Sequence, residues 1–139
     1  MYKRQALDWY IQDFQRRHNI RTFLDVQGST RRLPSEYETA LFRITQEALT
    51  NVAKHARASQ VTVQLEMAPT QVSLVIEDDG VGFDARKLLA SNASRTAWGL
   101  LGIQERTILM GGECSIVATP GHGTLIEIKL PLAQEAIHV

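Results

Sequence analysis

The sequence predicts an α/β protein of the α+β kind, a two-layer sandwich in which helices cover one face of a mixed sheet. Two observations predict it. Several short segments alternate apolar and polar residues, as strands with one buried face do. Amphipathic segments with apolar residues at helical spacing stand between some of these strands. The expected order of elements is α-β-α-β-β-α-β-β, and packing the apolar face of the sheet against the helices buries both.

The first part of the chain is expected to hold two helices with a strand between them. Residues 4–18 have an amphipathic helical pattern, and residues 20–27 alternate as a strand does. Ser35 and Glu38 have the spacing of a capping box, in which the hydroxyl accepts one backbone N–H and the glutamate reaches back to another. They predict the start of a long second helix that continues to about Ala56.

Strands dominate the rest of the chain. The segments expected there, in order, are strands 61–66 and 72–77 as a hairpin, a short helical stretch at 84–90, a loop at 91–98, a helix from about Leu100 to Met110, and strands 114–118 and 124–130. Gly111-Gly112 can supply a left-handed cap that ends the last helix. Because no repeat or linker interrupts the pattern, we expect a single domain over residues 1–139, with a core at about 5–132 and a tail at 133–139.

Composition excludes several classes of protein. The chain has 139 residues, enough for one domain with a proper core, and its 15 basic residues balance 15 acidic ones. No global charge therefore favours nucleic acid or an anionic membrane. No apolar run approaches the roughly 20 residues of a membrane span. The single Cys114 cannot form an internal disulfide, which fits a reducing cytosol, and we interpret it as a buried structural thiol.

One face of the long helix carries the groups of a phosphate site. Glu47, Asn51, Lys54 and His55 stand at i, i+4, i+7 and i+8, which is one face of an α-helix. An acid, an amide, an ammonium and an imidazole in a row are the groups needed to hold a metal-bound polyphosphate. The opposite face is apolar, so this polar row is expected to face a ligand rather than plain solvent.

A second candidate segment, Asp78-Asp79-Gly80-Val81-Gly82, follows the strand expected at 72–77. An Asp-Gly turn after a strand is often only a turn. For Asp79-Gly80 alone, a plain turn is about as good an interpretation as a ligand site. Two glycines two residues apart also let the backbone approach a flat ligand closely. The carboxylate of Asp78 can accept a hydrogen bond from the exocyclic amine of adenine, although guanine offers an amine too.

Two further glycine-rich segments are candidates for phosphate contacts. Gly99 and Gly102 are expected to open a helix, and backbone N–H groups at a helix N-terminus bind phosphate. A tight entry from loop to helix explains the same pair without a ligand. The turn 121–123 precedes Thr124, whose hydroxyl can donate to a phosphate oxygen. The chain has no Gly-x-x-x-x-Gly-Lys-Ser/Thr phosphate loop and no zinc-type cysteine and histidine spacing.

These motifs resemble a known family. Residues 42–51 (Phe-Arg-Ile-Thr-Gln-Glu-Ala-Leu-Thr-Asn) and 99–106 (Gly-Leu-Leu-Gly-Ile-Gln-Glu-Arg) look like those of the catalytic, ATP-binding domain of bacterial sensor histidine kinases. The resemblance covers about residue 5 to Leu132 and is nearest to the branch of nitrate sensors and desaturase-regulating sensors. The wider group includes gyrase, Hsp90 and MutL ATPases. The resemblance implies a Bergerat-type ATP-binding fold, with ATP and Mg²⁺ as ligands.

The resemblance also implies roles for individual residues. Asn51 would bind Mg²⁺ through its side-chain carbonyl, and Glu47 would order the ligands around the metal, with proton abstraction by Glu47 left open. Lys54 and His55 would contact phosphate, and Asp78 would accept the adenine amine. The residues matched to the remaining nucleotide contacts are Gly80, Gly82, Gly99, Leu100, Gly102 and Thr124. Residues 88–98 match the ATP lid, in which Trp98 is expected to pack the lid down.

The family's reaction sets the expected partners. The γ-phosphoryl group of ATP would pass to a histidine on a preceding dimerisation domain, then to a response regulator with a helix-turn-helix output. Nothing in this sequence matches the acceptor segment, and apolar helical positions start almost at Met1, so a piece of a longer chain is expected. We expect a cytoplasmic monomer without direct nucleic-acid or membrane contact, from a parent protein that can be anchored in the inner membrane.

Two other functions remain open at this point. One is a related protein kinase that phosphorylates a serine of an anti-sigma antagonist with the same nucleotide site. The match at residues 42–51 argues against it, and testing each acceptor would decide. The other is a nucleotide-binding regulator without catalysis. Intact Glu47, Asn51, Lys54 and Asp78 disfavour a dead site.

Overall fold

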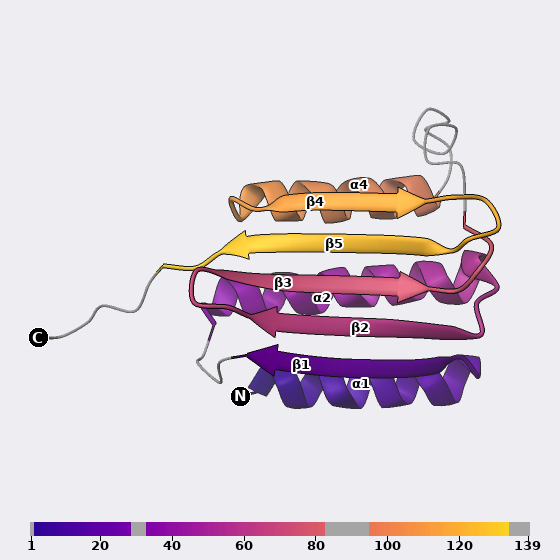
Figure 1. The fold of residues 1–139 in the computed structure, drawn as a ribbon. Helices are drawn as coiled ribbons and strands as arrows, with labels where there is room; N and C mark the ends of the chain where they lie inside the picture. Colours follow the sequence, from indigo (N-terminus) through magenta and orange to yellow (C-terminus); the bar gives the residue numbers. More distant parts are fainter. Residues whose placement is uncertain (1, 29–32, 83–94, 134–139) are drawn as a thin grey trace, which may run out of the picture.

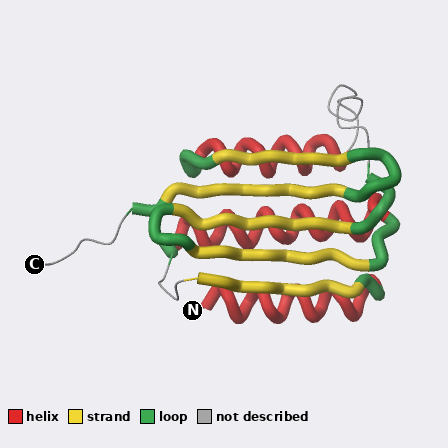
Figure 2. Tube along the Cα trace, viewed as in Figure 1, coloured by secondary structure: helices red, strands yellow, loops and turns green. Residues whose placement is uncertain are grey.

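The computed structural model describes residues 2–28, 33–82 and 95–133, with the side chains of residues 2–4 and 95–98 left out. The elements run in the order α1 (Tyr2–His18), β1 (Arg21–Gly28), α2 (Ser35–Asn51), η1 (Val52–Ala56), β2 (Gln60–Met67), β3 (Gln71–Asp78), α4 (Arg95–Leu109), β4 (Glu113–Ala118) and β5 (Thr124–Pro131). Figure 2 shows the same path coloured by secondary structure. The expected order of helices and strands is confirmed.

Five strands form one mixed sheet in the order β1-β2-β3-β5-β4. β1 and β2 are parallel, and every other neighbouring pair is antiparallel. Helices α1, α2 and α4 all lie behind the sheet in Figure 1, so the described helices cover one and the same face of it. The predicted fold class, a mixed sheet with helices on one face, is therefore confirmed.

The core lies between the sheet and the helices, and α2 is its central helix. Ile44 and Leu49 of α2 are almost fully buried, as are the strand residues Val63, Leu74 and Ile128. In the strands, inward residues alternate with outward ones, as the sequence pattern predicted. Burial of this kind of apolar surface contributes roughly 25 cal/mol per Å².

The start of α2 differs from the prediction. Ser35 is the first residue inside the helix, and Pro34 is the N-cap, without a side-chain cap hydrogen bond. The Pro34 carbonyl instead accepts hydrogen bonds from the backbone N–H groups of Tyr37 and Glu38, at 3.0 and 3.1 Å. The predicted capping box is thus wrong, because Pro34 takes the cap position and leaves the serine one place too far along the chain.

The end of the long helix also differs. α-Helical bonding stops at Asn51, and Val52–Ala56 form a π-helical turn, η1, closed by Arg57 in the left-handed conformation (φ 51°). A π-turn is wider than an α-turn and is often found at functional sites. The extent to Ala56 is as predicted, but residues beyond Asn51 do not keep the α-helical angular spacing.

Helix α4 begins earlier than expected, at Arg95 instead of about Leu100, so the end of the predicted loop is helical. Its C-terminus is as predicted: Gly111 is left-handed (φ 78°), and the Gly112 N–H donates to the Thr107 carbonyl at 2.9 Å. The helical stretch expected at 84–90 lies outside the described residues, as does most of the expected tail.

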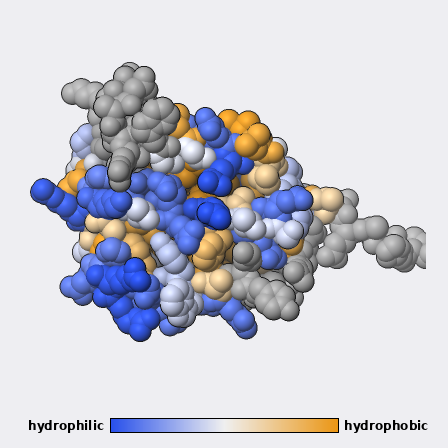
Figure 3. Space-filling view, turned by 180° about the vertical axis from the view of Figure 1, so that it is seen from behind, coloured by the Kyte–Doolittle hydropathy of each residue, from blue (hydrophilic) through white to orange (hydrophobic). Residues whose placement is uncertain are grey.

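The helix-covered side of the molecule is largely hydrophilic (Figure 3). Hydrophobic side chains gather where α4 ends, and there Ile108 and Leu109 are 68% and 80% exposed. Across the parts of the chain that the structure describes, no helix is both long and apolar enough to span a bilayer. Cys114 is half-buried, and burial raises the pKa of its thiol, which suits the structural role expected for it.

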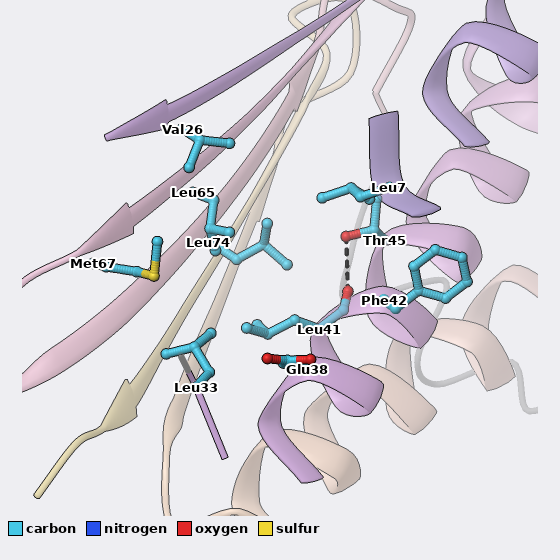
Figure 4. A pocket seen from close by; sticks show the side chains of 10 residues that line it. All are labelled: Leu7, Val26, Leu33, Glu38, Leu41, Phe42, Thr45, Leu65, Met67 and Leu74. Atoms are coloured by element: carbon cyan, nitrogen blue, oxygen red, sulfur yellow. Dashed lines mark hydrogen bonds between the residues drawn. The ribbon is translucent and has the colours of Figure 1, made fainter. Parts of the chain in front are cut away.

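A small apolar cavity of about 50 Å³ lies between α1, α2 and the sheet. Figure 4 shows its lining, in which Thr45 turns its hydroxyl back to donate to the Leu41 carbonyl at 2.8 Å. Its strand residues include Met67, which pairs with Val72 at the end of the hairpin opposite Asp78. This part of the cavity therefore lies at the opposite end of the hairpin from Asp78.

Candidate nucleotide site

The candidate site lies at one end of the sandwich, where three elements converge. Helix α2 ends there with η1, helix α4 begins there, and β3 ends there at Asp78 (Figure 1). Because α2 runs toward this end and α4 runs away from it, the two helices are antiparallel neighbours over the sheet. The sequence segments that predicted a nucleotide site are thus brought to the same end of the fold.

Asp78 is a buried carboxylate held by backbone amides. It is 8% exposed, and its Oδ1 accepts a hydrogen bond from the Gly80 N–H at 2.8 Å. The backbone N–H of Thr124, which faces Asp78 in the register of β3 and β5, also donates to this carboxylate. Burial is the largest influence and raises the pKa of Asp78 above its usual value, while the two amide bonds oppose that shift. A buried acceptor of this kind suits a neutral donor such as a base amine.

The neighbouring Asp79 has a different task. Its carboxylate accepts from the backbone N–H groups of Ser59 (2.8 Å) and Gln60 (3.0 Å) and from the Ser59 hydroxyl. The hydroxyl bond is the largest of the causes that lower the pKa of Asp79. Asp79 therefore fastens the start of β2 to the turn after β3 and is a structural residue.

The glycines beside Asp78 are required by the protein itself. A β-carbon on Gly80 would stand 2.1 Å from the Ala56 carbonyl oxygen, and one on Gly82 would stand 2.2 Å from that of Thr119. Gly82 also has a left-handed backbone, with φ 66°. The structural reason for both glycines is close packing of the turn against η1 and the β4–β5 turn, a reason the sequence interpretation lacked.

Asn51, Glu47 and Gly99 meet where α2 faces α4. A β-carbon on Gly99 would stand 2.2 Å from Glu47 Oε1 and 3.3 Å from Asn51 Nδ2. Asn51 Nδ2 is buried and has no hydrogen-bond partner among the described residues. A buried donor without an acceptor costs about 1–3 kcal/mol, so such a group normally has a use. A phosphate oxygen would satisfy it.

The same group of residues fits a magnesium ion. Mg²⁺ prefers oxygen ligands and is usually held by one or two protein groups together with phosphates and water. The Asn51 amide and the Glu47 carboxylate are oxygen-bearing groups that both lie against Gly99. The structure therefore brings two of the predicted site residues together, and Mg²⁺ binding by them stays a prediction.

Lys54 and His55 lie beyond Asn51, on η1. Both are exposed, and no hydrogen bond or ion pair involves either side chain within the described part of the chain. Because η1 is a π-turn, their angular spacing from Glu47 and Asn51 is not the α-helical one used in the prediction. A contact of Lys54 or His55 with phosphate stays a prediction.

The predicted residues of α4 differ in their surroundings. Leu100 is 2% exposed and belongs to the core. Gly99 is the fifth residue of α4, not its first, and so does not offer a free helix-terminal N–H as predicted. A β-carbon on Gly102 would meet nothing within 4 Å. The side chain of Trp98 lies outside the described part.

An open pocket of about 490 Å³, with polar and apolar lining residues, lies between α2 and α4 next to Glu47 and Gly99. We call it the α2–α4 pocket. It is lined by Arg43, Ile44, Gln46, Glu47, Thr50, Gly99, Gly102, Ile103 and Arg106. Sequence reasoning did not single out Arg43 or Arg106 as site residues. The signal for Arg43 was present, since it stands four residues before Glu47 on the same helix face.

Comparison with protein families decides what kind of domain this is. Residues 36–134 match the family described as histidine kinase-, DNA gyrase B- and HSP90-like ATPases. The chain belongs to this family. The segment matched contains all of α2 but its first residue, the turn after β3, and α4, which are the elements that form the candidate site. The resemblance seen in the sequence is thus confirmed.

Relatives within this ATPase family include sensor kinases. The chain is 38% identical over 132 residues to the signal transduction histidine-protein kinase/phosphatase DegS of Brevibacillus brevis, covering 94% of this chain and 32% of that protein. It is 47% identical over 102 residues to an uncharacterised sensor-like histidine kinase of Chloroflexus aurantiacus, covering 73% and 17%. The chain thus spans a third or less of the length of these relatives.

Solved structures agree on the fold. The histidine kinase domain of a blue-light activated kinase from Erythrobacter litoralis superimposes with a TM-score of 0.71 at 23% identity, covering 91% of this chain and 59% of that one. The Acinetobacter baumannii histidine kinase AdeS gives 0.72 at 15% identity, covering 94% and 63%. This member of the ATPase family therefore shares the fold of histidine kinase catalytic domains.

Proposed function

We propose that this domain binds Mg-ATP and, in a longer parent protein, donates the γ-phosphoryl group to a histidine on another domain. The observation that carries the proposal is the buried Asn51 Nδ2, which lies beside Gly99 and Glu47 and has no hydrogen-bond partner among the described residues. It is supported by membership of the ATPase family and by the sensor histidine kinases among the relatives.

In this proposal Asp78 accepts the exocyclic amine of adenine. The Gly80 and Thr124 N–H groups already donate to its carboxylate and so orient it. Because burial excludes water there, the bond to the amine counts for more than it would at the surface. Asp78 thereby fixes the base, and the phosphates extend toward Asn51.

At the other end, Asn51 and Glu47 would hold Mg²⁺, with the Asn51 carbonyl as ligand. Mg²⁺ supplies charge neutralisation to the phosphates when bound. The transfer breaks the bond between the γ-phosphorus and the bridging oxygen, which leaves with ADP. It forms a bond between that phosphorus and an imidazole nitrogen of the acceptor. Most of the catalysis then comes from positioning and electrostatics.

The acceptor histidine and its dimerisation domain are partners we propose in the parent protein, with a response regulator downstream. The use of ATP as donor argues for a cytoplasmic location. We propose that the isolated domain is a monomer. We also propose that it turns ATP over slowly or not at all, because the acceptor histidine is expected on another domain.

The proposal is tested by calorimetric titration with ATP, with and without Mg²⁺. Wild type is expected to bind, Asp78→Asn to lose binding, and Asn51→Ala to lose the Mg²⁺ dependence while retaining weak ATP binding. Ser115→Ala, on the outward face of β4, is a control that should bind as wild type does. If wild type binds ATP neither with nor without Mg²⁺, the proposal is refuted.

A further inference from the structure

Two arginines share the α2–α4 pocket with the proposed phosphate site. Arg43 and Arg106 both line it, one from each helix, and Glu47 and Gly99 line it too. Arg43, Glu47 and Asn51 stand at i, i+4 and i+8, so they form one ridge of α2. At about 1.5 Å per residue, Arg43 lies about 12 Å along the helix from Asn51.

No residue that the structure describes neutralises either guanidinium. Within the described ranges, no ion pair or side-chain hydrogen bond involves Arg43 or Arg106. Arg43 does not pair with Glu47, although the two stand one helical turn apart. Two cations at one pocket repel each other unless an anion lies between them. The planar guanidinium fork suits a phosphate, which it binds through two parallel hydrogen bonds.

The order of groups along α2 gives the pocket its direction. The turn after β3 packs on η1, because the Val81 N–H donates to the Ala56 carbonyl at 2.7 Å. Asp78, where β3 ends, therefore lies near the end of η1, which continues α2 toward its C-terminus. Moving away from it, the ridge presents Asn51, then Glu47, then Arg43. A nucleotide with its base at Asp78 and its phosphates directed toward Asn51 would have its outermost phosphate nearest the Arg43 end of this ridge.

We propose that Arg43 and Arg106 bind the terminal phosphoryl group of the nucleotide and so distinguish ATP from ADP. This inference rests on the proposed function and adds to it the two residues that recognise the group to be transferred. Their charge would also offset the negative charge that the phosphoryl group carries during transfer.

The test compares the affinity for ATP with the affinity for ADP, both with Mg²⁺, in wild type, Arg43→Gln and Arg106→Gln. Each variant is expected to lose about tenfold or more in ATP affinity, the size of one charge-assisted hydrogen bond. ADP affinity should stay within about twofold, because the group contacted is absent from ADP. Thermal melting of each variant verifies that it is folded.

Arg16→Gln is the matched control for the loss of a positive charge. Arg16 lies on α1, is highly exposed and pairs only with Asp13 among the described residues, so this variant should alter neither affinity. Equal losses for ATP and ADP, or no loss for either, would overturn the inference while leaving the proposed ATP site intact. If wild type binds neither nucleotide, the proposed function fails and this inference falls with it.

Discussion

Gly99 of α4 and Glu47 of α2 lie so close that a β-carbon at position 99 would stand 2.2 Å from Glu47 Oε1. The contact joins the two helices at the point where the proposed phosphate site begins. The Glu47 carboxylate can occupy this position because residue 99 has no side chain. A glycine on one helix thus leaves room for an acid of the site on the other.

Gly99→Ala should displace the Glu47 carboxylate and weaken Mg-ATP binding. The clash falls on the far end of a flexible side chain, so the fold should survive while the acid turns away. We expect about a tenfold loss in affinity, equivalent to roughly 1.4 kcal/mol. Titration calorimetry measures the affinity, and circular dichroism verifies the fold.

Gly102→Ala is the companion variant for stability. A β-carbon there meets nothing within 4 Å, and the position is inside a helix. Alanine should therefore raise the free energy of unfolding by up to about 1 kcal/mol.

Unchanged binding by Gly99→Ala would contradict the role assigned to the Gly99 contact. Lower stability of Gly102→Ala would contradict the open space at Gly102.

Asp78→Asn should separate stability from binding. Burial raises the pKa of Asp78 from its ordinary 3.8, so the charged form is unfavourable in the folded state. Such a group stabilises the fold most below its ordinary pKa, and this contribution is lost as pH rises through the higher folded value. At pH 7 the asparagine variant should be at least as stable as wild type, and its stability should vary less across this pH range.

The same variant should not bind ATP. The asparagine oxygen can accept from the Gly80 and Thr124 N–H groups, which leaves its NH₂ facing the amine of adenine, donor against donor. Urea unfolding from pH 4 to 8 and ATP titration test the two halves. Lower stability at pH 7 would show that the charge of Asp78 supports the fold, contrary to this expectation.

Asp79→Ala should have the opposite pattern, with lower stability and normal ATP affinity. The variant loses three hydrogen bonds that the carboxylate accepts from Ser59 and Gln60, and we expect a cost of about 1–2 kcal/mol. The lowered pKa of Asp79 means that its contribution is present above pH 3.8 and is lost as pH falls through the folded value.

Chemical denaturation and ATP titration measure these two effects of Asp79→Ala. Asp79→Asn retains an acceptor oxygen and should lose less stability than the alanine variant. A drop in ATP affinity with stability unchanged would reverse the roles assigned to Asp78 and Asp79.

Asn51→Ala should not destabilise the nucleotide-free protein. It removes a buried amide donor whose lack of an acceptor costs about 1–3 kcal/mol, and this relief offsets the packing that the asparagine side chain provides. Thr45→Ala is a matched comparison on the same helix, because its buried hydroxyl donates to the Leu41 carbonyl. Thermal melts should show a clear loss of stability for Thr45→Ala only. A similar loss for Asn51→Ala would mean that Asn51 is structural.

Much of the fold follows from local sequence patterns. Apolar alternation found each strand to within a few residues, because each strand has one buried face. The capping box failed because Pro34 occupies the cap position, which the serine-glutamate spacing does not register. The early start of α4 was missed because residues 95–98 have no apolar periodicity of their own.

The site was predictable in part, for a similar reason. Glu47, Asn51 and Asp78 could be identified by residue type and spacing. The π-turn could not, because it arises where the helix end packs on the turn after β3, a contact between residues far apart in sequence. The arginines of the α2–α4 pocket become site candidates only when α2 and α4 are seen side by side.

The fastening between η1 and the turn after β3 has a consequence for how the chain can be divided. Ala56 holds Val81, and Asp79 holds Ser59 and Gln60, so two stretches some twenty residues apart are tied together by backbone and carboxylate bonds. A cut at the exposed hairpin tip, 69–70, would place the two stretches on different fragments. The same bonds would then have to form between the fragments, so the base-binding end should appear only when complementary fragments divided there reassemble.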